Sequence, residues 1–133
     1  MKHGPKTLLV TAFTALSFLS ATSAFAAQNN YHSTYDFEYG VVTHQKFNTT
    51  DTPSCYISTV PNTKKTTGLT MSKILRKHDG LIWASELDER EVSATSNNGV
   101  TLTGDGSGKY DVYLKAREDG RKYVGKVSVY CNW

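Results

Sequence analysis

The sequence predicts an all-β domain, a β-sandwich of about seven to eight short strands closed by one disulfide. Three observations predict it. Apolar and polar side chains alternate with period two in most segments after residue 34, and turn-forming Gly, Pro, Asn, Asp and Ser residues separate these segments. Helical periodicity is scarce, and the chain contains two cysteines. Short strands at this spacing are typical of a sandwich.

The first 26 residues have the pattern of a cleaved secretion signal. Lys2 and Lys6 make the start basic, residues 8–26 carry no charge, and Ala24 and Ala26 occupy the −3 and −1 positions of a cleavage site after Ala26. A membrane anchor is the competing interpretation, but the apolar run is shorter than the ~20 residues that a span needs. We therefore predict a signal peptide over residues 1–26 and a secreted or periplasmic protein.

Residues 27–133 are predicted to form one sandwich domain with no membrane span. Without Lys2 and Lys6, 13 Lys and Arg residues remain against 12 Asp and Glu residues, which is a net charge of +1. A nucleic-acid-binding domain usually carries a strong basic stripe. The basic residues at 64–65 and 73–77 are balanced by acidic residues between 79 and 91. We interpret these groups as solvated surface charge and expect no nucleic-acid partner.

The two cysteines, Cys55 and Cys131, are expected to form a disulfide. An even pair in an oxidising compartment normally joins. Closing a loop of this length contributes about 4 kcal/mol by the chain-entropy model. Because a Cys-x-x-Cys motif is absent, we interpret the bond as structural rather than as the centre of a redox enzyme.

In the amino-terminal half, short strands alternate with polar turns. Residues 27–34 are polar and predicted to be frayed. Strands are predicted at residues 36–43, 55–60 and 67–75, with breaks at 48–53 and 61–65. The strand at 67–75 fits either a late bulge or a helical turn at its end.

Residues 78–90 fit both a strand and a helix. The segment Leu81–Ala84 is typical of a buried strand, whereas together with Glu86, Leu87 and Glu89 it equally fits one short helix. We prefer a strand followed by a tight charged turn, and the choice between strand and helix stays open.

The final third has the clearest strand pattern. It follows predicted strands at residues 91–95 and 100–103 and a loop at 104–108. Residues 109–116 and 121–131 alternate with period two, and a Gly-containing turn, Arg117–Gly120, lies between them. Tyr123, Val127, Val129 and Cys131 share one face. We predict that the two segments pair as a β-hairpin.

Tyr110 stands where a tyrosine corner would place it, although it also fits a plain core aromatic. In such a corner, a Tyr near the start of strand F hydrogen-bonds back to the preceding loop. If Tyr110 starts strand F, residues 55–60 are strand B and residues 121–131 are strand G. In an immunoglobulin-like sandwich, strand B starts and strand G ends at the same pole, so Cys55 and Cys131 meet there.

Three segments resemble the E-F-G end of bacterial immunoglobulin-like domains. These segments are residues 98–103, 108–116 and 125–129, and they cover about a third of the chain. Domains of this kind are repeated in adhesins of the invasin and intimin type. The resemblance implies an immunoglobulin-like fold and a role in adhesion or virulence. The chain departs from these adhesins in showing one domain and no tandem repeat, so the resemblance supports the fold more than the role.

No pattern in the sequence predicts catalysis, a metal site or a cofactor. His32, His44 and His78 lie at no metal-ligand spacing from one another. The Gly-x-Ser-x-Gly nucleophile elbow is absent. A Ser–His–Asp arrangement assembled in three dimensions stays open as an alternative, but we expect a protein that is not an enzyme.

Two further segments each have a possible functional interpretation and a purely structural one. Asp88, Glu89 and Glu91 could supply a glycosidase pair, and we interpret them as a solvated turn. The loop Gly104–Gly108 is similar to phosphate and calcium loops but lacks their Lys-Ser/Thr and their spaced carboxylates. We interpret it as a flexible strand connection.

Aromatic side chains are the strongest candidates for contact with a partner. Exposed Tyr and Trp residues make good protein or sugar contacts, and the alternative is that they cover the core. The candidates are Tyr35, Tyr39, Tyr113, Tyr130 and Trp133.

These observations predict a secreted binding protein, an adhesion or virulence-associated exoprotein that contacts a protein or surface glycan. The alternative is a periplasmic inhibitor or immunity protein that blocks a hydrolase or toxin. The oligomeric state does not follow from the sequence.

Overall fold

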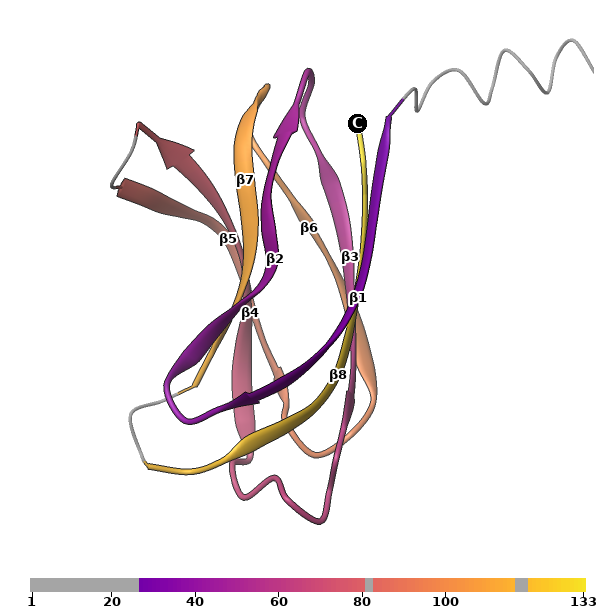
Figure 1. Cartoon of the computed structure of the whole chain (residues 1–133), viewed down its shortest axis with the longest axis vertical. Coiled ribbons are helices and arrows are strands. Elements are labelled where there is room, and N and C mark those ends of the chain that lie inside the picture. The colour runs from indigo at the N-terminus through magenta and orange to yellow at the C-terminus, as the bar shows by residue number, and fades with distance from the viewer. Residues whose placement is uncertain (1–26, 81–82, 117–119) are drawn as a thin grey trace, which may run out of the picture.

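The computed structural model describes residues 27–133 with the exception of 81–82 and 117–119 (Figure 1). The predicted signal peptide lies outside the described residues. The described part consists of eight strands and their connections and contains no helix. The strands are β1 (Gln28–Phe37), β2 (Gly40–Thr49), β3 (Ser54–Pro61), β4 (Thr70–Asp79), β5 (Trp83–Ser93), β6 (Asn98–Thr103), β7 (Gly108–Lys115) and β8 (Tyr123–Asn132).

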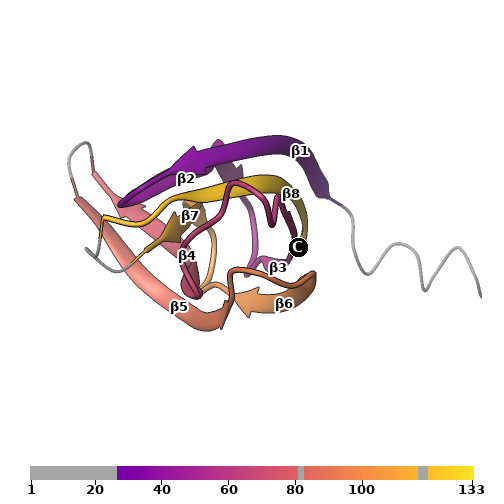
Figure 2. The same cartoon turned by 90° about the horizontal axis from the view of Figure 1, so that it is seen from below.

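The strands form two four-stranded antiparallel sheets. Sheet A has the order β1-β8-β3-β6, and sheet B has the order β2-β7-β4-β5. Seen end-on in Figure 2, β1 continues into β2 along one border of the molecule and β5 continues into β6 along the opposite border. The predicted all-β sandwich is therefore confirmed. Among the described residues, no helix is long and apolar enough to cross a membrane.

Alternating side chains from both sheets fill the space between them. In β8, Tyr123, Val127, Val129 and Cys131 are buried, as predicted, while the residues between them are partly or fully exposed. Burial of apolar surface stabilises the fold by roughly 25 cal/mol per Å². Among the fully buried side chains of this core, the largest apolar ones are Tyr110, Tyr123, Ile57, Leu75, Leu102 and Leu114.

The disulfide between Cys55 and Cys131 is confirmed. The two cysteines are directly opposed residues of the neighbouring strands β3 and β8, with a Cα–Cα distance of 4.0 Å. Both are buried in the core. The bond therefore joins the start of β3 to the end of β8 within sheet A.

Tyr110 anchors the loop before β7. Its hydroxyl lies 2.7 Å from the carbonyl oxygen of Gly106 and 2.9 Å from that of Asp105, and it accepts a hydrogen bond from the Asp105 amide at 2.9 Å. The Tyr110 ring is fully buried. The side chain thus bonds back to the loop at residues 104–108, and this is the contact that the tyrosine-corner interpretation of Tyr110 predicts.

The predicted hairpin of the final third is wrong. β7 belongs to sheet B, where it lies between β2 and β4, while β8 belongs to sheet A, where it lies between β1 and β3. The chain between them crosses from one sheet to the other. Period two shows which side chains face the core, but it is identical for two strands of one sheet and for two strands that face each other across the core.

The amino-terminal segment is also more ordered than predicted. Residues 28–34, expected to be frayed, belong to β1, which pairs with β8 over its whole length. The predicted strand at 36–43 is divided, because β1 ends at Phe37 and β2 begins at Gly40. Backbone hydrogen bonds to β8 hold β1 in place although its outward side chains are polar.

The described residues of the ambiguous segment at 78–90 form strand, except Gly80, which is a turn residue after β4. β4 and β5 are antiparallel neighbours, and Gly80 adopts a φ of 84° just after β4. β5 passes without interruption through the predicted charged turn, because an edge strand accommodates charged side chains on its solvent side. Of the two interpretations left open for the end of the segment at 67–75, a late bulge and a helical turn, the register shift between Leu75 and Arg76 fits the bulge.

Candidate functional site

The five predicted aromatic contacts do not form one site. Tyr35 is buried and packs against Phe37 in the core. Tyr39 is 60% exposed between β1 and β2, and Trp133 stacks on Phe47 at the carboxyl terminus. The Arg76 guanidinium covers the Tyr113 ring on sheet B, at 4.4 Å from its centre.

Tyr130 belongs to an exposed aromatic group on the outer face of sheet A. Tyr56 of β3 is its directly opposed residue, and their ring centres lie 6.4 Å apart. His32 of β1 packs edge-on against Tyr130 at 5.4 Å. Tyr56 is 46% exposed and Tyr130 41% exposed. We call His32, Tyr56 and Tyr130 the aromatic face.

The ring of Tyr56 lies across the neighbouring strand β6. A Cβ atom at Gly99 would overlap the hydroxyl and ring carbons of Tyr56. Gly99 is not the residue opposite Tyr56, which is Thr101, so the ring extends diagonally over the sheet. The absence of a side chain at Gly99 therefore lets the Tyr56 ring rest on the sheet.

Hydroxyl and amide side chains surround the aromatic face. Nδ1 of His32 lies 2.9 Å from Oγ of Ser128. Ser58 is directly opposed to Ser128, Asn30 to Tyr130, and Thr101 to Tyr56. Four adjacent strands thus present neutral polar groups beside the aromatic rings, and these groups can donate and accept hydrogen bonds.

A groove of about 420 Å³ continues along sheet A from these residues. Its volume lies within the range of small-molecule sites. Tyr35 is among the lining residues, and its hydroxyl is the buried side-chain group without a hydrogen-bond partner in the described part of the chain. Burial raises the pKa of Tyr35 to about 12. The other lining residues are Thr34, Asp36, Val60, Pro61, Asn62, Val124, Gly125 and Lys126. We call this the Val60 groove.

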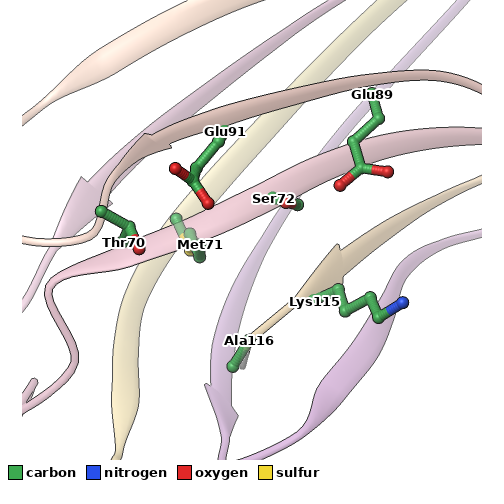
Figure 3. A pocket seen from close by; sticks show the side chains of 7 residues that line it. All are labelled: Thr70, Met71, Ser72, Glu89, Glu91, Lys115 and Ala116. Atoms are coloured by element: carbon green, nitrogen blue, oxygen red, sulfur yellow. The ribbon is translucent and has the colours of Figure 1, made fainter. Parts of the chain in front are cut away.

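A second hollow, of about 540 Å³, lies on sheet B (Figure 3). Glu89 and Glu91 extend from β5 over β4, and Lys115 lies on β7 at the other side. The two carboxylates belong to one strand at i and i+2, so they project side by side and do not face each other across the hollow. The carboxyl groups of a glycosidase flank the scissile bond. The predicted turn is wrong for this segment, because Glu89 and Glu91 belong to a strand, but both residues are exposed as predicted.

Farther along β4 and β7, charged residues form a largely buried network. The Asp111 carboxylate is 1% exposed. It accepts hydrogen bonds from Nε and Nη2 of Arg76 at 2.8 and 2.9 Å, and it lies 2.6 Å from Nε2 of His78. The hydrogen bond to Asp111 raises the pKa of Arg76. A paired and hydrogen-bonded carboxylate tolerates burial, so this network links β4 to β7.

Lys73 does not belong to the predicted solvated surface charge, so that prediction is wrong for this residue. Its side chain is fully buried between the sheets. Its Nζ donates to the carbonyl oxygen of Ile57 and to both the carbonyl and side-chain oxygens of Asn98. Burial lowers the pKa of Lys73 to about 8.

Sequence reasoning missed Tyr56 and Lys73, although a signal for both was present. Cys55 and Ile57 are apolar at period two and buried, so alternation puts Tyr56 on the outer side of the strand. Lys73 lies between Met71 and Leu75 at period two, and both of these neighbours are buried. The same alternation therefore identifies one exposed aromatic residue and one buried ammonium.

Within the described ranges, no group of three His, Cys, Asp or Glu residues is arranged to hold a metal ion. A scan against protein-family models matches no family, and a search of curated proteins finds no relative.

Proposed function

We propose that the chain is an exported binding module of the immunoglobulin-like type, associated with adhesion or virulence, and that the aromatic face contacts a protein or a surface glycan. The observation that carries the proposal is the pair of neighbouring exposed tyrosines, Tyr56 and Tyr130, on a regular sheet. Tyr side chains bury a large apolar area at low entropic cost and are enriched where binding energy concentrates.

Several strand pairings support an immunoglobulin-like arrangement. In that fold, strands B and E share one sheet and strands C and F share the other. Here β3 pairs with β6, and β4 pairs with β7. The hydrogen bonds of Tyr110 at the start of β7 fit strand F. The final strand differs, because β8 lies beside β3 while β2 occupies the position next to β7.

The disulfide is compatible with an oxidising, extracellular or periplasmic compartment. Binding is the activity that we infer from the exposed rings of the aromatic face. His32 is engaged with Ser128, and the two tyrosine rings present apolar surface and hydroxyl groups. These groups supply contact area and hydrogen bonds to a partner.

The experiment is a binding assay with the disulfide-bonded protein of residues 27–133. The labelled protein is applied to bacterial cells, host cells and extracellular matrix, and Tyr56→Ala and Tyr130→Ala are compared with the parent. We expect the double variant to lose most of the retained label. Tyr39→Ala is the matched control, since Tyr39 is a more exposed tyrosine away from the sheet. Equal retention of the parent and the double variant would overturn the proposal.

A second candidate, an inhibitor or immunity protein, draws on a different feature. The hairpin of β4 and β5 projects from the body of the sandwich (Figure 1). Trp83 at the start of β5 is 74% exposed, opposite Asp79 of β4. A projecting segment with a large aromatic side chain is suited to entering the cleft of a hydrolase or toxin.

Copurification separates the two candidates. If the protein is an inhibitor, a hydrolase or toxin copurifies from the periplasm with the parent and not with Trp83→Ala, and Tyr56→Ala leaves that complex intact. If the aromatic face is the binding surface, Tyr56→Ala abolishes copurification of the partner and Trp83→Ala leaves it unchanged.

A further inference from the structure

We infer that the partner of the aromatic face is a neutral oligosaccharide, and that it extends from Tyr56 and Tyr130 along sheet A into the Val60 groove. This inference rests on the proposed function and specifies its ligand. It follows from three properties of the face: an exposed aromatic surface, a near absence of net charge, and continuity with a groove of suitable volume.

The aromatic surface begins at Tyr56. The hydroxyl end of its ring lies over Gly99 on β6, and the side chain is 46% exposed, so part of the ring is open to a ligand. The apolar C–H groups of a sugar ring stack on such an aromatic surface. The ring of Tyr130, centred 6.4 Å away and tilted by 32°, extends this surface toward β1.

The charge of the face favours a neutral ligand. Asp36 is the carboxylate that lines the Val60 groove, and Lys122 pairs with it at 2.8 Å. Lys126 is the remaining charged group of the groove lining. An anionic polysaccharide or a nucleic acid is normally held by several clustered Lys and Arg residues. The groups nearest the rings are instead the neutral side chains of Asn30, Ser58, Thr101 and Ser128.

These neutral groups match the hydroxyls of a sugar. Hydroxyl side chains donate and accept, and the Asn amide does both at separate atoms. Because each sugar hydroxyl also donates and accepts, an array of mixed donors and acceptors satisfies it without a charge. A protein partner would also contact the tyrosines, but it would gain less from a shallow array of small hydroxyl groups, since hot spots concentrate in Trp, Tyr and Arg.

The Val60 groove gives the ligand a direction. Between Tyr130 and Lys126 the strand β8 advances by four residues, or about 13 Å at the rise of an antiparallel strand. Val60 is 46% exposed beside Lys126, so the groove offers apolar as well as polar contacts.

The test is a glycan panel that contains neutral, sialylated and sulfated oligosaccharides, probed with the disulfide-bonded protein and followed by calorimetry on the glycans that bind. We expect neutral oligosaccharides to bind, with a dissociation constant that changes little with salt. Tyr56→Ala and Tyr130→Ala should each weaken binding by about tenfold or more. Tyr39→Ala is the control and should bind as the parent does.

An NMR titration with a neutral oligosaccharide provides a readout that needs no variant. The amide resonances of His32, Ser128 and Tyr130, together with those of Val60 and Lys126, should shift as the ligand is added. Shifts confined to sheet B would overturn the inference.

The remaining outcomes separate the inference from the proposed function. Binding that is restricted to acidic glycans and depends strongly on salt would overturn the inference that the ligand is neutral. In a further outcome, the protein binds no glycan, and its retention on cells depends on Tyr56 and is abolished by protease treatment of the cells. That result would overturn the inference of a glycan ligand and would leave the proposed binding module intact. If binding to every surface and glycan tested is unaffected by substitution of Tyr56 and Tyr130, both the neutral ligand and the proposed binding module are overturned.

Discussion

Nζ of Lys73 lies 2.7 Å from Oδ1 of Asn98, so an ammonium group from sheet B is held by an asparagine of sheet A inside the sandwich. The same ammonium donates to the Ile57 carbonyl oxygen at 2.9 Å. The Asn98 amide nitrogen in turn donates to the carbonyl oxygens of Ser93 and Ser96, which fixes the orientation of the side chain. The contact therefore ties β4 to both β3 and β6 through the core.

The first prediction is that Lys73 makes the protein more stable at alkaline pH. Burial lowers the pKa of Lys73 to about 8 in the folded state, against an ordinary 10.5. Between these values the unfolded chain binds more protons than the folded chain, so the free energy of unfolding rises with pH. The gain between about pH 7 and about pH 9.5 is on the order of 2 kcal/mol.

Urea unfolding at a series of pH values measures this gain. Lys73→Met is the reference variant, because it keeps the length of the side chain and removes the titrating group. As the pH rises, the free energy of unfolding of the parent should increase relative to that of the variant. Parallel curves for the two proteins over this range would show that Lys73 titrates normally.

The second prediction concerns the link between β3 and β8. Replacing both Cys55 and Cys131 by Ala should lower the free energy of unfolding by about 4 kcal/mol, because the unfolded chain is then no longer closed over the 76-residue separation of the cysteines. Urea denaturation of the double variant measures the loss. Reduction of the parent protein should give a midpoint near that of the variant. An unchanged midpoint under both treatments would mean that the bond contributes nothing to stability.

The sequence was sufficient to identify most strands. The predicted segments at 55–60, 100–103, 109–116 and 121–131 agree with β3, β6, β7 and β8 to within two residues at each end. The reason is that one side of each strand is buried, and burial imposes period two on the side chains. The disulfide was predictable because only two cysteines are present.

The pairing of the strands was not predictable from this pattern. Alternation shows which side chains point inward, but it does not show in which sheet a strand lies, so β7 and β8 were wrongly joined as a hairpin. β1 escaped detection because its outward residues are polar and its stability comes from backbone pairing with β8. The aromatic face depends on registers between β1, β3 and β8, three segments far apart in the chain, and these registers follow only from the assembled sheet.

The third prediction concerns the Tyr110 hydroxyl. Tyr110→Phe should lower the free energy of unfolding by about 1 to 3 kcal/mol, because it leaves the Asp105 amide and the Gly106 carbonyl without this buried partner. Urea unfolding measures the change. Tyr39→Phe is the control, since that side chain is mostly exposed, and it should change stability by less than about 0.5 kcal/mol. Equal effects of the two substitutions would show that the hydrogen bonds of Tyr110 do not hold the loop.

The fourth prediction connects the packing of Tyr56 to binding. Gly99→Ala places a methyl group where the Tyr56 hydroxyl lies, so the ring must leave its position on β6. The ring is exposed and free to rotate outward, so we expect the stability to change by less than about 1 kcal/mol. The aromatic surface that Tyr56 presents over β6 is then lost, and binding through the aromatic face should weaken nearly as much as in Tyr56→Ala.

Thermal unfolding and the cell or glycan assay, run side by side, measure these two effects of Gly99→Ala. Ser96→Ala is the control, because Ser96 is an exposed turn residue just before β6 and its substitution adds no atoms near Tyr56. A Gly99→Ala protein that binds like the parent would show that the orientation of the Tyr56 ring is irrelevant to the partner. A variant with lost binding and unchanged melting temperature would place the effect in the ring itself, because the sheet beneath it is then intact.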